Sequence, residues 1–274
     1  MKKFANGKMW DVITKLKSDI FQQNKVLVPN LSLKLVFWFA NPSFYLMSPD
    51  VETNYALEVV KTHLIVHYVD ASPGLTESVN SLLSSSAIAK YYLQYSRLKT
   101  YMVSKGDGSF TITDLFNSSS ILSEILFVLV KETSFRGSFT KNPYFFQNAK
   151  ITSITSYIDE EMQPFNTPLL VNFEDDCYSE VYNCLYEETA HRIHGEEMNK
   201  TLITPEDFKS GMSIFRLVFS SVDRNILQPC QRSGKLSLEL RFSQGVREPY
   251  VLLVYAKFPA TLEITSSGQV SLKA

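Results

Sequence analysis

The stretch "GKLSLELRFSQGVREPYVLLVYAKF" (234–258) carries the clearest secondary-structure pattern in the chain. From 234 to 242, apolar residues alternate with polar ones, so that the apolar side chains of an extended chain would share one face. The second half, 250–258, is almost continuously apolar. The linker between the halves contains Gly245 and Pro249, which are typical of a turn. We therefore predict two β-strands joined as a hairpin.

Other segments carry similar β patterns. Residues 121–132 end in a continuous apolar run, which is typical of a strand covered on both faces. Residues 151–159 also fit a helical stripe, but their content of Ile, Thr and Tyr favours a strand. Residues 97–105 run into "KGDG", which suits a tight turn that needs a positive φ. The predicted strands before the last pair are 31–39, 56–69, 97–105, 121–132, 151–159 and 212–219.

Few segments predict helices. Residues 175–194 have apolar side chains at helical spacing, with acidic residues early and basic residues late. A helix starts at 204–208, where Thr204 is the predicted cap, and Gly211 can end it. A third helix is predicted within 76–87. Many strands, long loops and no alternation of strands with helices predict a mostly β sandwich with a few short helices.

Composition excludes several function classes. The 274 residues include 27 Lys plus Arg and 28 Asp plus Glu, so the charge balance does not favour nucleic-acid binding. With 45% hydrophobic residues, the chain can build a core and is not of the disordered class. The longest apolar stretches, such as 125–130, are too short to span a bilayer. We expect no direct nucleic-acid motif and no membrane segment, and the three cysteines are interpreted as reduced, buried thiols of an intracellular compartment.

Motifs for catalysis are not found in the sequence. It contains no phosphate-binding loop of the GxxxxGK type, no GxSxG elbow and no HExxH. His191 and His194 are one helical turn apart and could offer one face of a metal site, or could form a solvated helix end with cationic residues. Cys177 and Cys184 are two helical turns apart, too far for a disulfide, and are predicted to pack. We therefore predict no catalytic, cofactor-binding or metal-ligating residue.

An aromatic-rich loop leads into one of the predicted strands. The segment "FRGSFTKNPYFFQNAKITSITSYID" (135–159) begins with five aromatic residues interrupted by Gly137, Asn142 and Pro143. Such a loop can be a binding platform or the packing at the mouth of a strand, and its composition leaves both readings open.

Five segments, taken in order, resemble the capsid proteins encoded by Polinton (Maverick) transposons and their adintovirus relatives. The family pattern has an xDIFxQN-type segment, a strand ending near "LMS", an FNGxFxxNPFxF-like loop, an EDFxxGY-like step from helix to strand, and a terminal strand pair ending in "YAEFD". The matching segments are "SDIFQQNKVLVPNLSLKLVF" (18–37), "FYLMS" (44–48), the loop 135–159, "ITPEDFKSGMSIFRLVF" (203–219) and "GKLSLELRFSQGVREPYVLLVYAKFPATLEI" (234–264).

The resemblance implies a structural, non-enzymatic protein. It is that of a double jelly-roll, hexon-like major capsid subunit that self-assembles into pseudo-hexagonal trimeric capsomers of an icosahedral shell. Residues 1–95 would be the later strands of a first, incomplete jelly roll plus a connecting helix, and 96–274 the second jelly roll. The implied partners are other copies of the chain and neighbouring capsid proteins such as a penton or minor capsid protein. The implied location is the virion, after assembly in the cytoplasm or nucleus of the host cell.

Within this family pattern, the loop supplies the candidate site. Its side chains are expected either to pack inside one subunit or to contact a neighbouring subunit, and no cofactor is implied. The candidate residues are Phe135, Gly137, Phe139, Asn142, Pro143 and Phe145.

Three alternatives stay open on the sequence alone. The chain could be a jelly-roll binding module for carbohydrates or receptors, with residues 139–146 as an aromatic platform. It could be a cupin-like enzyme whose metal site would have to start from the histidines at 191 and 194. It could also be a genomic remnant that does not assemble.

Overall fold

The computed structural model describes residues 9–16, 18–22, 25–28, 31–49, 56–85, 87–118, 122–186, 203–219, 234–265 and 267–273. Its strands are β1 (Ala89–Val103), β2 (Ser109–Ser118), β3 (Glu124–Lys131), β4 (Ile151–Ile158), β5 (Glu161–Met162), β6 (Leu169–Leu170), β7 (Phe215–Val218), β8 (Gly234–Phe242), β9 (Tyr250–Ile264) and β10 (Val270–Lys273). Its helices are the 3-10 helix η2 (Asp19–Gln22) and the α-helices α1 (Pro42–Tyr45), α2 (Pro73–Ser84), α3 (Glu132–Phe135), α4 (Ser179–Tyr186) and α6 (Pro205–Ser210). The fold is mostly β, with a few short helices, as the sequence predicts.

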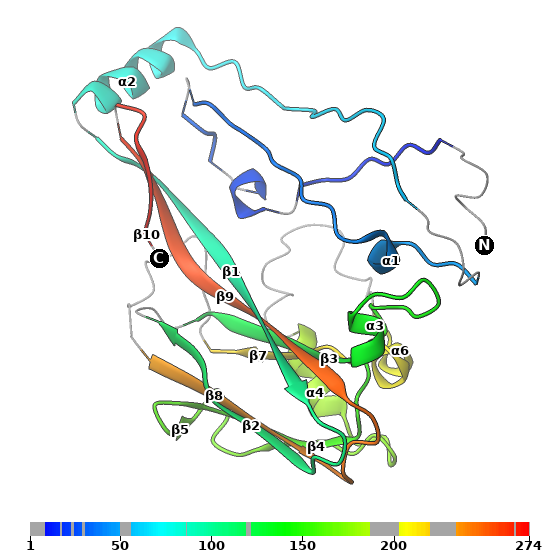
Figure 1. The fold of residues 1–274 in the computed structure, drawn as a ribbon. Coiled ribbons are helices and arrows are strands. Elements are labelled where there is room, and N and C mark those ends of the chain that lie inside the picture. Colours follow the sequence, from blue (N-terminus) through cyan, green and yellow to red (C-terminus); the bar gives the residue numbers. More distant parts are fainter. Residues whose placement is uncertain are drawn as a thin grey trace. The chain divides into compact units, whose positions relative to one another are not determined.

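The strands form two five-stranded sheets. In the first, which we call the β9 sheet, the order is β1-β9-β3-β7, and β10 pairs with the end of β9. In the second, the β8 sheet, the order is β2-β8-β4-β5, and β6 also pairs with β4. Figure 1 shows them as two layers, with β9 between β1 and β3 and with β8 beside β2.

The pairing of the strands is nested. The first strand pairs with the ninth, the second with the eighth, the third with the seventh and the fourth with the fifth. Along the chain, β1 to β4 and again β7 to β9 therefore alternate between the two sheets, whereas the short strands β5 and β6 lie in the same sheet as β4, and β10 lies in the same sheet as β9. This is the arrangement of a jelly-roll β-sandwich, the fold class that the sequence predicts.

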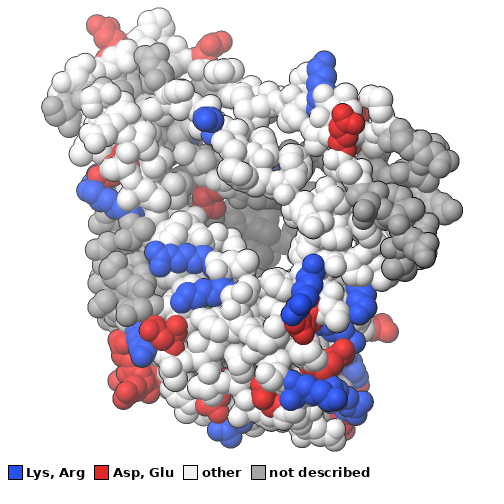
Figure 2. Space-filling view, in the orientation of Figure 1, with Lys and Arg blue, Asp and Glu red and all other residues white. Residues whose placement is uncertain are grey.

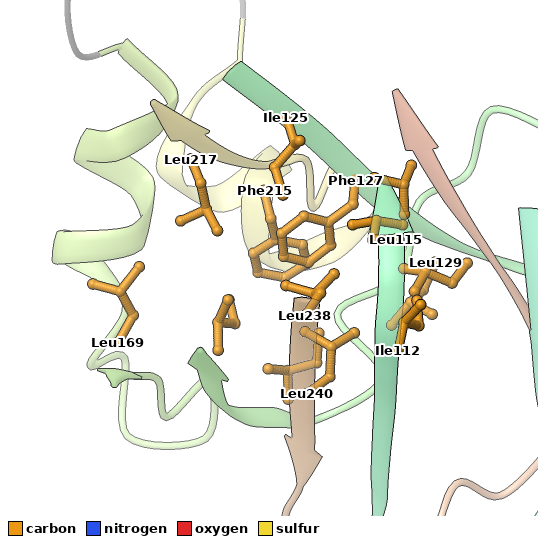
Figure 3. Close-up of a cluster of buried hydrophobic side chains, with 14 of the residues drawn as sticks. Ile112, Leu115, Ile125, Phe127, Leu129, Leu169, Phe215, Leu217, Leu238 and Leu240 are labelled. Atoms are coloured by element: carbon orange, nitrogen blue, oxygen red, sulfur yellow. The ribbon is translucent and has the colours of Figure 1, made fainter. Parts of the chain in front are cut away.

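Apolar residues of both sheets fill the space between the layers. Phe127 of β3 and Phe215 of β7 stack with ring centroids 5.1 Å apart. Figure 3 shows these two rings facing Leu238 and Leu240 of β8, all four of which are buried. The alternation that the sequence shows along β8 is therefore the alternation between core and outer face, and removing any of these side chains would leave a cavity.

Two units can be distinguished in the chain. The first contains residues 1–32, 68–93 and 261–273, and the second contains 33–67 and 94–260, so that β1 and β9 contribute to both. The jelly-roll core lies in the second unit. In the first unit, the buried Tyr91 hydroxyl donates to Val26 O (3.1 Å) and accepts from Val28 N (3.0 Å). The predicted division at residue 95 stays a prediction.

Most of the predicted elements are confirmed. Residues 151–158 form strand β4 rather than a helix, and the turn after β1 contains Gly106 at φ +96°. Helix α6 has a capping box in which Thr204 Oγ1 accepts from Asp207 N (3.1 Å). Helix α2 covers most of the third predicted helix, and α4 covers the described part of 175–194.

Three expectations are wrong. The last two long strands are not a hairpin, because β8 pairs with β2 and β4 whereas β9 pairs with β1 and β3, and the linker crosses from one sheet to the other. Segments 31–39 and 56–69 form no strand, since no described segment offers them a hydrogen-bonding edge. Cys177 is exposed rather than packed, whereas Cys184 is buried, as predicted.

Candidate functional site

The candidate loop follows strand β3, in the second unit. The short helix α3 ends at Phe135, and Gly137 comes two residues later with φ +89°, a conformation that favours glycine. Farther along, the Asn142 Oδ1 accepts a hydrogen bond from Tyr144 N at 2.9 Å, and Asn142 O accepts one from Phe145 N at 3.3 Å. Pro143 between them is buried. The side chain of Asn142 and the ring of Pro143 therefore hold the turn that presents the aromatic residues.

The segment around α1 packs against this loop. A Cβ placed on Gly137 would come within 2.6 Å of Ser43 Oγ, so the glycine permits a close approach of the two chains. Ser48 N donates to Phe139 O at 2.8 Å. The rings of Phe44 and Tyr144 meet edge to face with centroids 5.7 Å apart. The motif "FYLMS" (44–48) and the loop motif are therefore in direct contact.

The step from α6 to β7 holds the other side of the loop. Phe146 N donates to Gly211 O (2.8 Å), and Ser213 N donates to Phe146 O (3.2 Å). The ring of Phe145 covers Gly211 so closely that a Cβ on this glycine would lie 2.3 Å from Cε2 of the ring. Asn148 Nδ2 also donates to Lys209 O at 2.9 Å. A third motif, 203–219, therefore meets the same loop.

The aromatic side chains of the loop differ in exposure. Tyr144 is 54% exposed and Phe145 45%. Phe135, Phe139 and Phe146 are half-buried. The Phe145 ring is therefore covered where it lies against Gly211 and is otherwise open to solvent, and whether the loop residues contact a neighbouring subunit stays a prediction. The surface formed by Phe44, Tyr144 and Phe145 we call the aromatic patch.

A buried ionic cluster, which the sequence analysis missed, joins the strands of the β9 sheet. Glu124 of β3 and Arg216 of β7 are 2% and 6% exposed, and the Arg216 Nε and Nη2 lie 2.7 and 2.5 Å from Glu124 Oε2. Lys257 of β9 pairs with the other carboxylate oxygen, and Arg216 Nη1 also donates to Leu185 O (3.4 Å). One signal was present in the sequence, because the glutamate at 124 begins the apolar run of β3. Its partners could not be identified, because Arg216 and Lys257 are 92 and 133 positions farther along the chain.

Burial and ion pairing shift the pKa of the Glu124 carboxyl in opposite directions. Desolvation would raise the pKa of Glu124, but the hydrogen bond from Lys257 and the charges of Arg216 and Lys257 outweigh it. The pKa of Glu124 is therefore lower than usual, and the group stays ionised in the fold. Because all its oxygens are engaged, the cluster is a structural tie between strands and not a free acid or base.

The described residues offer little that could catalyse a reaction or hold a metal. They contain no group of three or more His, Cys, Asp or Glu side chains placed to bind an ion. His63 and His67 are exposed, whereas His191 and His194 lie outside the described residues. A shallow hollow of about 540 Å³ is lined by Glu161, Met162, Gln163, Pro164, Asn166 and Phe219, and Glu161 is its one titratable group. Among the described helices, none is long and apolar enough to cross a bilayer.

Charges on the surface are mixed. Figure 2 shows Lys and Arg interspersed with Asp and Glu on the face drawn, without a broad area of one sign among the described residues. Near the loop, Arg136 pairs with Glu132, and Lys141 Nζ donates to Thr133 Oγ1 at 2.9 Å. The drawn face therefore lacks the single-sign basic surface that binds a phosphate backbone.

Comparisons with solved structures return viral capsid proteins at low similarity. The structure resembles PBCV-1 VP54 fitted into a reconstruction of the virophage Sputnik, with a TM-score of 0.39 and 11% identity over 68% of this chain and 51% of that one. The mavirus major capsid protein gives a TM-score of 0.37 and 11% identity over 68% of this chain and 41% of that one. The Sputnik virophage structure gives 0.38 and 9% over 69% and 39%. The chain thus spans about half the length of the first of these proteins, and no family model and no curated protein matches it.

Proposed function

We propose that this chain is a structural capsid protein, a double jelly-roll major capsid subunit of a Polinton- or adintovirus-like element. The observation that carries the proposal is the meeting of three motifs in one place. The segments 44–48, 135–146 and 203–219 belong to the sequence pattern of that capsid family, and they contact one another through the bonds around Phe139, Tyr144 and Gly211. Motifs that are far apart in sequence but packed together support one shared fold and not chance matches.

The jelly-roll topology agrees with the proposal but cannot carry it. Jelly rolls occur in capsids and in lectins, so that the fold by itself leaves both functions open. What favours a structural role is that the buried ionic groups Glu124 and Arg216 are engaged in joining two strands of the β9 sheet. A capsid subunit needs contact surfaces and a rigid core, and it needs no pocket with tuned pKa values.

The first part of the chain would belong to a first jelly roll. Residues 31–39 and 56–69 have strand-forming sequences, and their side chains are largely exposed, for example Trp38 at 90% and Tyr68 at 89%. Such segments need neighbouring strands that the described residues do not supply. Residues 1–95 would then be later strands of one roll with the connecting helix α2, and 96–274 the second roll. Two rolls per subunit allow a trimer to approximate six-fold symmetry.

The proposed assembly is a homotrimeric, pseudo-hexagonal capsomer of a virion shell, with a penton or minor capsid protein as a neighbour. We expect the purified 274-residue chain to sediment as a trimer in analytical ultracentrifugation and to form capsomer-sized particles in negative-stain electron microscopy. A chain that stays monomeric at every concentration tested and forms no such particles would contradict the proposal. As a control for misfolding, a sample that has been unfolded and refolded should give the same far-ultraviolet circular dichroism spectrum as the purified chain.

The aromatic patch favours a second candidate function. Tyr144 and Phe145 are about half exposed, and the ring of Tyr144 contacts that of Phe44, so that exposed aromatic rings are available to stack on a sugar ring. A jelly-roll carbohydrate-binding module is therefore the alternative. A glycan array separates the two: binding that Tyr144→Ala abolishes would support the module, whereas an array with no signal above background removes it.

A further inference from the structure

The shallow hollow of about 540 Å³ lies where the edges of the two sheets meet. Strand β5, which supplies part of its lining, is at the edge of the β8 sheet. Phe219 directly follows β7, which is at the edge of the β9 sheet. The hollow is therefore bordered by both layers of the sandwich. The residues that line it are Glu161, Met162, Gln163, Pro164, Asn166 and Phe219.

The backbone that carries most of this lining is held by strand β4. Gln163 N donates to Ser156 O at 3.0 Å, and the hydroxyl of the buried Ser156 donates to Gln163 O. At its other end, the segment enters β6, which also pairs with β4. The segment 163–168 is therefore fixed at both ends before any ligand arrives, which lowers the entropy cost of binding.

The polar side chains of the hollow are not used by the fold. The Glu161 carboxylate and the carboxamides of Gln163 and Asn166 make no hydrogen bond or ion pair with the described residues. In other loops, by contrast, Asn142 and Asn148 each accept a backbone hydrogen bond with the side-chain oxygen and so fix a turn. The polar atoms of the hollow are therefore available to a ligand.

The composition of the hollow disfavours several classes of ligand. Its described lining contains no Lys, Arg or His, and it contains the carboxylate of Glu161, so a phosphate or another anion would meet a like charge. One carboxylate without His or Cys offers too few ligands for a metal ion. A wholly apolar ligand would leave the three polar side chains without partners. A neutral, polar ligand remains.

A sugar has the chemistry that this lining can recognise. A carboxamide offers a donor and an acceptor side by side, which matches the adjacent hydroxyl groups of a pyranose ring. The carboxylate accepts hydrogen bonds from further hydroxyl groups. The half-buried ring of Phe219 and the ring of Pro164 offer apolar surface to the C–H face of the sugar.

We propose that this hollow is a binding subsite for a neutral pyranose sugar. Gln163 and Asn166 bind its hydroxyl groups, Glu161 accepts from another hydroxyl, and Phe219 packs against the ring. This subsite is distinct from the aromatic patch, and it goes beyond the proposed capsid role, on which it does not depend.

A glycan array that carries neutral and sialylated oligosaccharides measures the binding. We expect neutral glycans to bind, and their sialylated forms to bind less, because Glu161 repels a second carboxylate. Gln163→Ala and Asn166→Ala should each weaken binding by about tenfold, since each removes a hydrogen-bonding side chain. Thr167→Ala is the matched control, because Thr167 is exposed on the same segment and does not line the hollow. None of these side chains has a described partner, so all three variants should melt like the wild type.

Methyl NMR locates the bound sugar. The chain is labelled with ¹³C in the methionine methyl groups and titrated with the methyl glycoside of the terminal sugar that binds best on the array. We expect the Met162 signal, assigned with Met162→Leu, to shift until the site is saturated. The signal of Met212, which follows Gly211 beside the aromatic patch, should stay in place.

Four results would overturn the inference. They are an array without signal above background, binding of sialylated glycans alone, a shift of Met212 without one of Met162, and binding that Tyr144→Ala abolishes while Gln163→Ala and Asn166→Ala leave it intact. Each of them leaves the capsid role standing, because sedimentation tests that role. A chain that is always monomeric but binds neutral sugars at Met162 would contradict the capsid role and support the subsite.

Discussion

At the scale of single residues, the candidate loop depends on close approaches that only glycine allows. Gly137 and Gly211 lie on its two sides, against Ser43 and Phe145. The absence of a Cβ at each position lets the loop touch two other segments at once. Phe145 packs against Gly211 and still has 45% of its surface exposed, so it can both pack in its own subunit and contact a partner.

Adding a methyl group at Gly211 should therefore disturb the loop. We expect Gly211→Ala to cost about 1–3 kcal/mol, because its Cβ would lie 2.3 Å from the Phe145 ring and the ring must move. Thermal melting measures the loss, with Gly108→Ala as the control, since nothing lies within 4 Å of a Cβ there. The double variant Gly211→Ala/Phe145→Ala should cost less than the sum of the two single variants. Additive losses would mean that the two residues do not touch.

The buried carboxylate of Glu124 is the second decisive residue. Its pKa is lowered from the usual 4.5, so the folded state favours the ionised form more than the unfolded chain does. The stability it contributes is therefore present above the unfolded pKa and is lost as the pH falls through the lower, folded pKa.

Replacing this carboxylate should change both stability and its dependence on pH. We expect Glu124→Gln to lose about 3–5 kcal/mol near neutral pH, because Arg216 and Lys257 are left without their counter-charge. Below pH 4.5 the melting temperature of the wild type should fall more steeply than that of the variant, so that the two curves converge. Glu239→Gln, whose partner Arg241 is 66% exposed, should cost about 1 kcal/mol or less. Parallel curves for Glu124→Gln and wild type would show that Glu124 does not titrate as described.

At the scale of elements, local signals fixed α6 better than any other helix. Thr204, Pro205 and Asp207 form a capped first turn within the sequence itself, and the buried Phe208 then anchors the turn in the core. The long strands were equally visible, since alternation along β8 is local. The partner of each strand was not, and the predicted hairpin of β8 and β9 was wrong for that reason.

Removing the cap of α6 should destabilise the fold moderately. We expect Thr204→Ala to lose about 1 kcal/mol, because Asp207 N loses its acceptor. The midpoint of urea unfolding measures the loss. Thr204→Ser keeps the hydroxyl oxygen and should unfold close to the wild type. Equal midpoints for all three proteins would mean that the capping box contributes nothing.

At the scale of the whole molecule, the outward-facing residues of the two sheets differ in chemistry. The β8 sheet turns polar pairs such as Thr155 with Glu239 outward, whereas the β9 sheet turns Leu126, Tyr255 and their neighbours outward. Exposed apolar side chains cost free energy in water and promote association. In the proposed capsid subunit, such side chains are candidates for contact with a neighbouring subunit.

The sequence by itself determined the class of the fold and the position of most of its elements. Strand-forming residue types, period-two alternation and capping residues act over a few positions. The strand at 151–158 could therefore be identified from its Ile, Thr and Tyr content, the strand at 234–242 from its alternation, and the helix at 205–210 from its cap. It also indicated the candidate loop, through Asn142, Pro143 and the aromatic residues around them. These features depend on neighbours in sequence, whose chemistry can be read directly.

Only the tertiary structure decided which strands pair, which charges meet and which faces stay open. The nested pairing of β1 with β9 and of β2 with β8 joins residues more than a hundred positions apart, and no local pattern specifies such a partner. The same holds for Glu124 with Arg216 and for the closeness of Phe145 to Gly211. Segments 31–39 and 56–69 have strand-forming sequences but form no strand in the structure. A strand-forming sequence becomes a strand only where another backbone offers hydrogen-bond partners.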